Sequence, residues 1–209
     1  MQIELVLSFS LASILLSFMP GPDNIFVLTE SITKGQKNGI AISIGLCIGV
    51  LIHTLAAATG ISIVIQKSAF AFSFIKYLGA AYLFYLAFMA NKEKPLEIFL
   101  GKKPKERKSK LFPLIKKGFF MNVLNPKVSL FFIAFLPQFI SQDGINITVQ
   151  MMILGLIFMV QALVIFSLIS ILASRLTVYV NNPKFWKITK FSKVGILSIL
   201  GLMLALSAK

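Results

Sequence analysis

The sequence predicts an all-α integral membrane protein with six transmembrane helices. Of its 209 residues, 57% are hydrophobic and only 13% are charged, and the mean hydropathy is +0.87. Soluble domains usually contain about 45–50% apolar and about 25% charged residues. Six long apolar segments follow one another along the chain, with most basic residues between them. This pattern excludes an ordinary solvated surface and a disordered chain.

Each apolar segment is long enough, or nearly long enough, to cross a bilayer, which takes about 20 residues. Several are longer, which predicts tilting or interruption. The last is short and is expected to extend back toward Phe191. The first has no basic residues before it and no small-residue cleavage site after it, so we expect it to be retained as a span. The segments are 5–31, 40–65, 69–90, 112–140, 147–173 and 194–208.

The basic residues indicate the orientation of these spans. Seventeen of the 21 lie in the first, third and fifth connections, ten of them between residues 91 and 117. Short cytoplasmic loops carry such an excess. The odd-numbered connections are therefore expected in the cytoplasm and both termini on the outer side of the cell membrane. A nucleic-acid patch is the alternative explanation of the third connection. Its basic core, 102–110, has no aromatic residues on which bases could stack, so attraction to anionic lipid headgroups is favoured.

Two of the predicted helices are interrupted by proline. The first span contains Pro20, Gly21 and Pro22, which together remove backbone donors and loosen the chain. The fourth contains Asn125 and Pro126, a favourable N-cap and a favourable first residue for a new half-helix. Broken backbone at membrane depth is tolerated only against protein or a water-filled cavity.

The positions of the two breaks indicate a repeat. They lie in the first spans of two three-span halves, about 1–90 and 112–209, joined by a basic loop at 91–111. Because three is odd, the second half enters from the opposite side of the membrane. We therefore expect one transporter domain, residues 1–209, built as a 3+3 inverted repeat. Broken helices in corresponding places point to the central site of such a protein.

Both breaks carry polar and charged residues. Asp23 or Asn24 is expected to cap the second half of span one. Asp23 and Lys127 are ionisable residues inside apolar segments, where a charge costs about 2.5–3.5 kcal/mol. One interpretation is structural: the two residues pair with each other or cap half-helix ends.

The functional interpretation is a site for a zwitterion. Its carboxylate would meet Lys127 and free backbone amides, and its ammonium would meet Asp23. Both interpretations hold if the pair closes when the site is empty. The expected transport path comprises Pro20, Gly21, Pro22, Asp23, Asn24, Asn125, Pro126 and Lys127.

Four further residues in the second span stand out. His53 changes charge near neutral pH and is a candidate proton relay, although a histidine bonded to a neighbouring helix is an equal alternative. Gly45 and Gly49 form a G-x-x-x-G element, which fits either internal packing or a homodimer. Cys47 is the single cysteine, so the chain has no internal disulfide.

Several short segments, taken together and in order, resemble the LysE/RhtB family of amino-acid exporters. They cover roughly residues 15–140: MPGPDN at 19–24 with Lys34-Gly35, GVLIH at 49–53 running to GIS at 60–62, KYLGAAYL at 76–83, NPK at 125–127, FF at 131–132 and LPQF at 136–139. Many members have a polar uncharged residue where this chain has Asp23. Ammonium binding by that acid is therefore inferred from the residue and not from the family.

The resemblance implies a six-span exporter in a bacterial inner membrane that moves amino acids or related small metabolites. It implies protons as the coupling ion and no cofactor. His53 is most similar to the homoserine/threonine branch. The alternatives are an exporter of metal or inorganic ions, for which the spans hold few ligands, and a non-transporting scaffold. An enzyme is not expected, because the sequence has no G-x-S-x-G, H-E-x-x-H or paired intramembrane aspartates.

Overall fold

A computed structural model describes residues 2–19, 21–61, 68–92, 110–141, 144–173, 175 and 182–207. Every regular element in these ranges is a helix, which confirms the all-α class. The elements are α1 (Ile3–Phe18), α2 (Pro22–Lys34), α3 (Gln36–Ala56), the π-helix η1 (Ala57–Ile61), α5 (Ala69–Lys92), α6 (Leu111–Val123), α7 (Pro126–Leu130), the π-helix η2 (Phe131–Phe135), the 3-10 helix η3 (Leu136–Phe139), α8 (Ile147–Ile171) and α10 (Pro183–Leu206).

The described helices account for all six expected spans. Four are long and apolar enough to cross a membrane by themselves: α3 continued by η1, α5, α8 and α10. Two bent pairs complete the set, with α1 and α2 at 55° and α6 and the segment Pro126–Phe139 at 49°. The interruptions therefore occur in the first and fourth spans. The inverted relation between the two halves stays a prediction.

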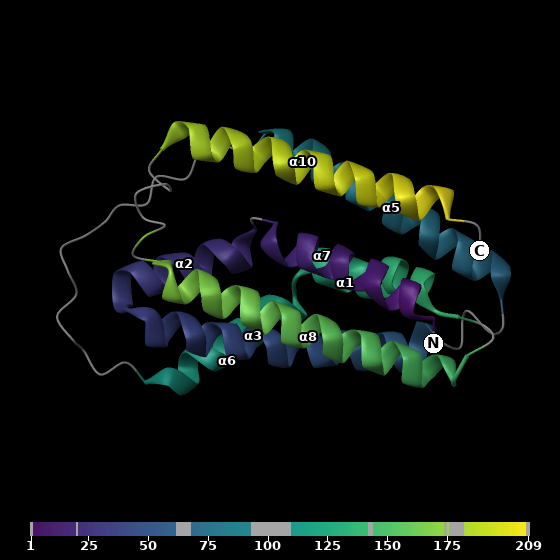
Figure 1. The fold of residues 1–209 in the computed structure, drawn as a ribbon, viewed down its shortest axis with the longest axis horizontal. Coiled ribbons are helices and arrows are strands. Elements are labelled where there is room, and N and C mark those ends of the chain that lie inside the picture. Colours follow the sequence, from purple (N-terminus) through teal and green to yellow (C-terminus); the bar gives the residue numbers. More distant parts are fainter. Residues whose placement is uncertain are drawn as a thin grey trace.

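The helices form two layers (Figure 1). In one, α5 and α10 pack side by side along their length. In the other, α3 packs against α6, α8 and α2, while α1 packs against α8. Corresponding spans of the two halves thus contact each other, third with sixth and second with fifth. The layers meet where α5 contacts η2.

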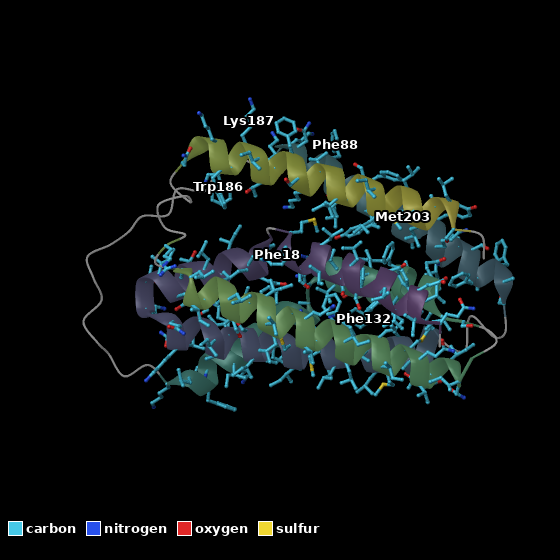
Figure 2. All side chains as sticks on the ribbon, in the orientation of Figure 1. Phe18, Phe88, Phe132, Trp186, Lys187 and Met203 are labelled. Atoms are coloured by element: carbon cyan, nitrogen blue, oxygen red, sulfur yellow. The ribbon has the colours of Figure 1, made fainter. Side chains whose placement is uncertain are left out.

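Buried phenylalanines fill the larger layer around the broken fourth span. Phe131 of η2 stacks against Phe9, Phe135 and Phe158 with ring centroids 5.1–5.9 Å apart. Phe132 lies in the same layer (Figure 2) and is fully buried. In contrast, many large apolar side chains on the outer helix faces are exposed, such as Phe70 at 83%. An apolar exterior of this extent suits contact with lipid.

Glycines allow α3 and α6 to approach closely. A Cβ at Gly45 would overlap the carbonyl oxygen of Ile115, and one at Gly49 would lie 2.7 Å from the Cβ of Asn122. From the other side, a Cβ at Gly118 would overlap the carbonyl oxygen of Ile42. The G-x-x-x-G element of the second span is therefore used for internal packing, one of the two alternatives that the sequence left open.

The two ends of the bundle differ in charge. Both termini lie at one end, whereas α2 ends and α10 begins at the other (Figure 1). Lys187 marks this second end in Figure 2. The described basic residues near it include Lys34, Lys37, Arg175 and Lys184. This agrees with the expected grouping of the odd-numbered connections, although residues 93–109 of the basic loop lie outside the described residues.

The last helix begins earlier than the hydropathy predicts. It starts at Pro183 instead of near residue 191, because Asn182 caps it by accepting from the backbone N–H of Lys184 at 2.9 Å. Its first turns are helical but basic, with Lys184, Lys187, Lys190 and Lys193 at every third position. Averaging hydropathy along the sequence cannot detect such a basic extension of a span.

Candidate functional site

The break in the first span lies between the end of α1 at Phe18 and Pro22, the first residue of α2. Gly21 is the N-cap residue, in an extended conformation, and no side chain caps the helix. The expectation that Asp23 or Asn24 caps α2 is therefore wrong, because with Pro22 at the first position both lie inside the first turn. The side-chain amide of Asn24 instead donates to the carbonyl oxygen of Ser17 at 2.8 Å. Pro20 lies outside the described residues.

The break in the fourth span has the cap that the sequence predicts. Asn125 precedes α7, and its Oδ1 accepts from the backbone N–H of Lys127 at 3.0 Å. Pro126 is the first helical residue. An asparagine before a proline thus starts the second half of this span.

Asn125 also joins the two breaks. Its Nδ2 donates to Oδ2 of Asp23 at 2.6 Å, a short bond between residues 102 positions apart in the sequence. Asp23 is only 3% exposed, and Asn125 is buried. The amide therefore stabilises a buried carboxylate with one end and a helix start with the other.

Lys127 lies at the end of α1. Its Nζ donates to the carbonyl oxygen of Leu16 at 3.4 Å and approaches Gly21, where an added Cβ would lie 3.5 Å away. It interacts electrostatically with Asp23, but the two form no direct ion pair. Of the two structural roles expected for Lys127, the structure therefore shows the lysine at the negative end of a half-helix. It does not show a closed Asp23–Lys127 ion pair.

The two charged residues occupy equivalent positions. Asp23 follows Pro22 as the second residue of α2, and Lys127 follows Pro126 as the second residue of α7. In the structure, an acid and a base stand at the same place after each break.

His53 contacts the same region from α3. Its Nε2 lies 3.0 Å from the carbonyl oxygen of Asn122, which also accepts from the backbone N–H of Asn125 at 2.8 Å. Because a carbonyl can only accept, Nε2 is the nitrogen that donates this hydrogen bond. The structure therefore connects His53 through Asn122 and Asn125 to Asp23. Asn122 has no role in the sequence-based site, and its position four residues before Pro126 gives no signal for one.

Several polar atoms at the breaks are buried without a hydrogen-bond partner. Among the described residues these include Ser17 Oγ, Asn24 Oδ1 and Asn122 Oδ1. Such atoms are costly unless water or a ligand satisfies them. The described ranges contain no group of three His, Cys, Asp or Glu residues that could hold a metal ion. The polar inventory of the breaks is thus one carboxylate, one ammonium, amides and hydroxyls.

Comparison with known proteins agrees with the resemblance seen in the sequence. The model of the LysE type translocator family matches residues 14–208. The "Uncharacterized membrane protein YrhP" of Bacillus subtilis (strain 168) is 33% identical, over 88% of this chain and 89% of its own length. The "Homoserine/homoserine lactone efflux protein" of Salmonella typhimurium and that of Salmonella typhi are each 29% identical over 98% of both chains. No solved structure matches the chain.

The family match covers nearly the whole chain, including both breaks, five whole spans and the first span from residue 14 onward. It is a family of membrane translocators, consistent with the apolar helices and with a role other than catalysis. The chain belongs to the LysE type translocator family.

Proposed function

We propose that the protein exports a small neutral amino acid, of the homoserine or threonine type, or a related metabolite from a bacterial cell. The observation that carries the proposal is the pairing of Asp23 and Lys127 at equivalent positions of two broken spans, linked by Asn125 but not closed into an ion pair. Opposite charges held apart inside apolar spans suit a ligand that carries both charges.

The substrate would bind between the two breaks. Its ammonium replaces the amide of Asn125 at the carboxylate of Asp23, and its carboxylate draws the Nζ of Lys127 away from Leu16. Asn24 and Ser17, each with an unpartnered buried oxygen, would accept hydrogen bonds from the ammonium or from a hydroxyl side chain. When the substrate leaves, Asn125 and Leu16 take these partners back, so neither charge is left buried alone.

The charges also support a neutral substrate. One acid and one base at the breaks balance a zwitterion, whereas a basic or acidic side chain would need a further counter-charge. Two relatives that align over 98% of the chain are named for efflux of homoserine and homoserine lactone. Homoserine is therefore the first substrate to test.

Proton coupling is part of the proposal, with His53 as the relay. Its Nδ1 is the exchangeable site, and its Nε2 contacts the peptide that positions Asn125. Loss of a proton from Nδ1 would therefore act on the same segment that holds Asp23. Proton flow into the cell would drive export outward.

The proposed location is the inner membrane, with the basic end of the bundle in the cytoplasm and both termini outside. The lysines at the start of α10 would contact anionic lipid headgroups. The transport path requires only one chain. A homodimer would have to use a surface other than Gly45 and Gly49, which α6 covers.

The test is export from cells that express or lack the protein, loaded in turn with homoserine, threonine, other neutral amino acids and a divalent metal. Asp23→Asn and Lys127→Ala should abolish amino-acid release while the protein stays in the membrane. Dissipating the proton gradient should stop release against a concentration gradient. Release of the metal but of no amino acid would support the ion-exporter alternative, and normal release by both variants would refute the zwitterion site.

A further inference from the structure

The buried acidic residues of the described chain lie on one helix. Glu4, Asp23 and Glu30 are the acidic residues that the structure describes. Glu4 is exposed, whereas Asp23 and Glu30 are 3% and 7% exposed. Both buried acids belong to α2, the half-helix that runs from the break to the basic end of the bundle (Figure 1).

Asp23 and Glu30 share one face of α2. Seven residues make almost two full turns, so the two side chains point in nearly the same direction, about 10 Å apart along the axis. Val27 lies between them on this face and is fully buried. The face thus carries a carboxylate at each end and an apolar side chain in between.

Glu30 is only partly satisfied. Its Oε1 accepts from Nζ of Lys34 at 3.0 Å, but its Oε2 is buried and has no hydrogen-bond partner. The Lys34 side chain is 56% exposed and the Glu30 side chain only 9%, so the ion pair reaches from solvent to a buried oxygen. A buried carboxylate oxygen without a partner is costly and would be stabilised by a cationic donor.

The helix itself increases the demand for a cation. Glu30 lies near the C-terminal end of α2, where the helix dipole is negative and an acid is unfavourable. If Glu30 served only to pair with an exposed lysine, a position facing solvent would avoid this cost. The buried orientation therefore requires another explanation.

We propose that Glu30 is a second ammonium-binding site on the export path. It takes the amino group of the substrate from the basic, cytoplasmic end and passes it to Asp23, about 10 Å further along the same helix face. Oε2 accepts the hydrogen bond, and Lys34 keeps Oε1 occupied so that the site binds only one cation. This inference rests on the proposed export of amino acids.

The experiment measures uptake of radiolabelled homoserine into two kinds of membrane vesicle. In inside-out vesicles the cytoplasmic face meets the medium, and in right-side-out vesicles the outer face does. Glu30→Gln should raise the KM for homoserine about tenfold in inside-out vesicles, because one charge-assisted hydrogen bond to the substrate is lost. In right-side-out vesicles the KM should stay within about twofold of the wild-type value. Asp23→Asn should abolish uptake in both.

Two matched variants separate binding from a structural role. Lys34→Gln removes the ion pair but leaves the carboxylate, and its KM should not rise. Glu4→Gln removes an exposed acid and should behave as the wild type. An equal rise in KM for Lys34→Gln and Glu30→Gln would show that Glu30 serves only the ion pair, and would overturn the inference. Should Glu30→Gln be absent from the membrane, Glu30→Asp, which keeps the charge but withdraws the carboxylate by one methylene, should raise the KM in inside-out vesicles and leave it unchanged in right-side-out vesicles.

A proton is the other cation that Oε2 could bind. Counterflow, the exchange of labelled for unlabelled homoserine without a proton gradient, distinguishes the two. Glu30→Gln should slow counterflow from the cytoplasmic face; if it slows only gradient-driven transport, the site binds a proton and the inference is wrong. Normal uptake by Asp23→Asn, or no transport by the wild type, would refute the proposed function as well. An unchanged KM in Glu30→Gln beside an inactive Asp23→Asn would refute the inference alone.

Discussion

Asn125 provides a quantitative test of the arrangement at the breaks, because it makes two separable hydrogen bonds. Its Oδ1 caps α7 and its Nδ2 donates to Asp23 at 2.6 Å. Asn125→Ala loses the cap, worth about 1 kcal/mol, and a bond to a carboxylate, worth about 1.5–3 kcal/mol. Asn125→Ser keeps a good capping oxygen but is too short to reach Asp23, so it should lose only the second contribution.

The chain contains a matched control for the cap. Asn182, Pro183 and Lys184 repeat the same tripeptide at the start of α10, where Asn182 caps the N–H of Lys184 at 2.9 Å and its side chain is exposed. For a domain of this size each kcal/mol shifts the Tm by about 2–4 °C. Asn182→Ala should therefore lower the Tm of the protein in detergent by about 2–4 °C, and Asn125→Ala by roughly 5–16 °C.

The measurements are thermal unfolding of the purified protein and homoserine efflux from cells. Asn125→Ser should unfold several degrees below the wild type, whereas Asn182→Ser should match it. The same Asn125→Ser variant should export poorly, because nothing replaces the amide at the empty Asp23 site. Equal Tm values for the two serine variants, with normal efflux by both, would refute the link between the two breaks.

Three other changes test other parts of the structure. Gly45→Ala should destabilise the protein by about 1–3 kcal/mol or more because the new Cβ overlaps the backbone of α6, while Gly195→Ala, with open space around it, should be neutral or stabilising by up to about 1 kcal/mol; thermal unfolding in detergent compares them. His53→Gln keeps an N–H donor for the neighbouring carbonyl but cannot titrate, so homoserine counterflow should persist while gradient-driven export is lost. Lys76→Met removes the buried ammonium that donates to the carbonyl oxygen of Ser207 at 2.9 Å, and should lower the Tm while the KM for homoserine stays unchanged.

Much of the fold could be predicted because the bilayer imposes it. Length and hydropathy identify the spans, and the prolines at the breaks, two in the first span and Pro126 in the fourth, interrupt helices for a local reason that the sequence shows directly. The start of α10 could not be found in this way, since its first turns carry a lysine at every third position. The local signals were present, however: an asparagine cap followed by proline, the same pair that begins α7.

The site was harder to predict, because it depends on which residues face each other. The sequence identifies Asp23, Asn125 and Lys127 as unusual, but not that one amide joins them. It also cannot show that Glu30 is buried, since an acid four residues before the first lysine of a basic connection looks interfacial until its helix is packed. Burial and partners are properties of the tertiary contacts, which no local pattern encodes.

The register of the two breaks has the largest consequence for mechanism. With Pro22 matched to Pro126, Asp23 and Lys127 are equivalent residues of the two halves. Under the predicted inverted repeat, the operation that exchanges the halves also exchanges the acid and the base. A zwitterion bound between them therefore keeps one favourable contact with each half in both the inward-open and the outward-open state. Two acids or two bases at these positions would bind a substrate of one charge, and would leave like charges facing each other whenever the site was empty. The opposite signs thus suit the proposed carrier, which must return without substrate after each cycle.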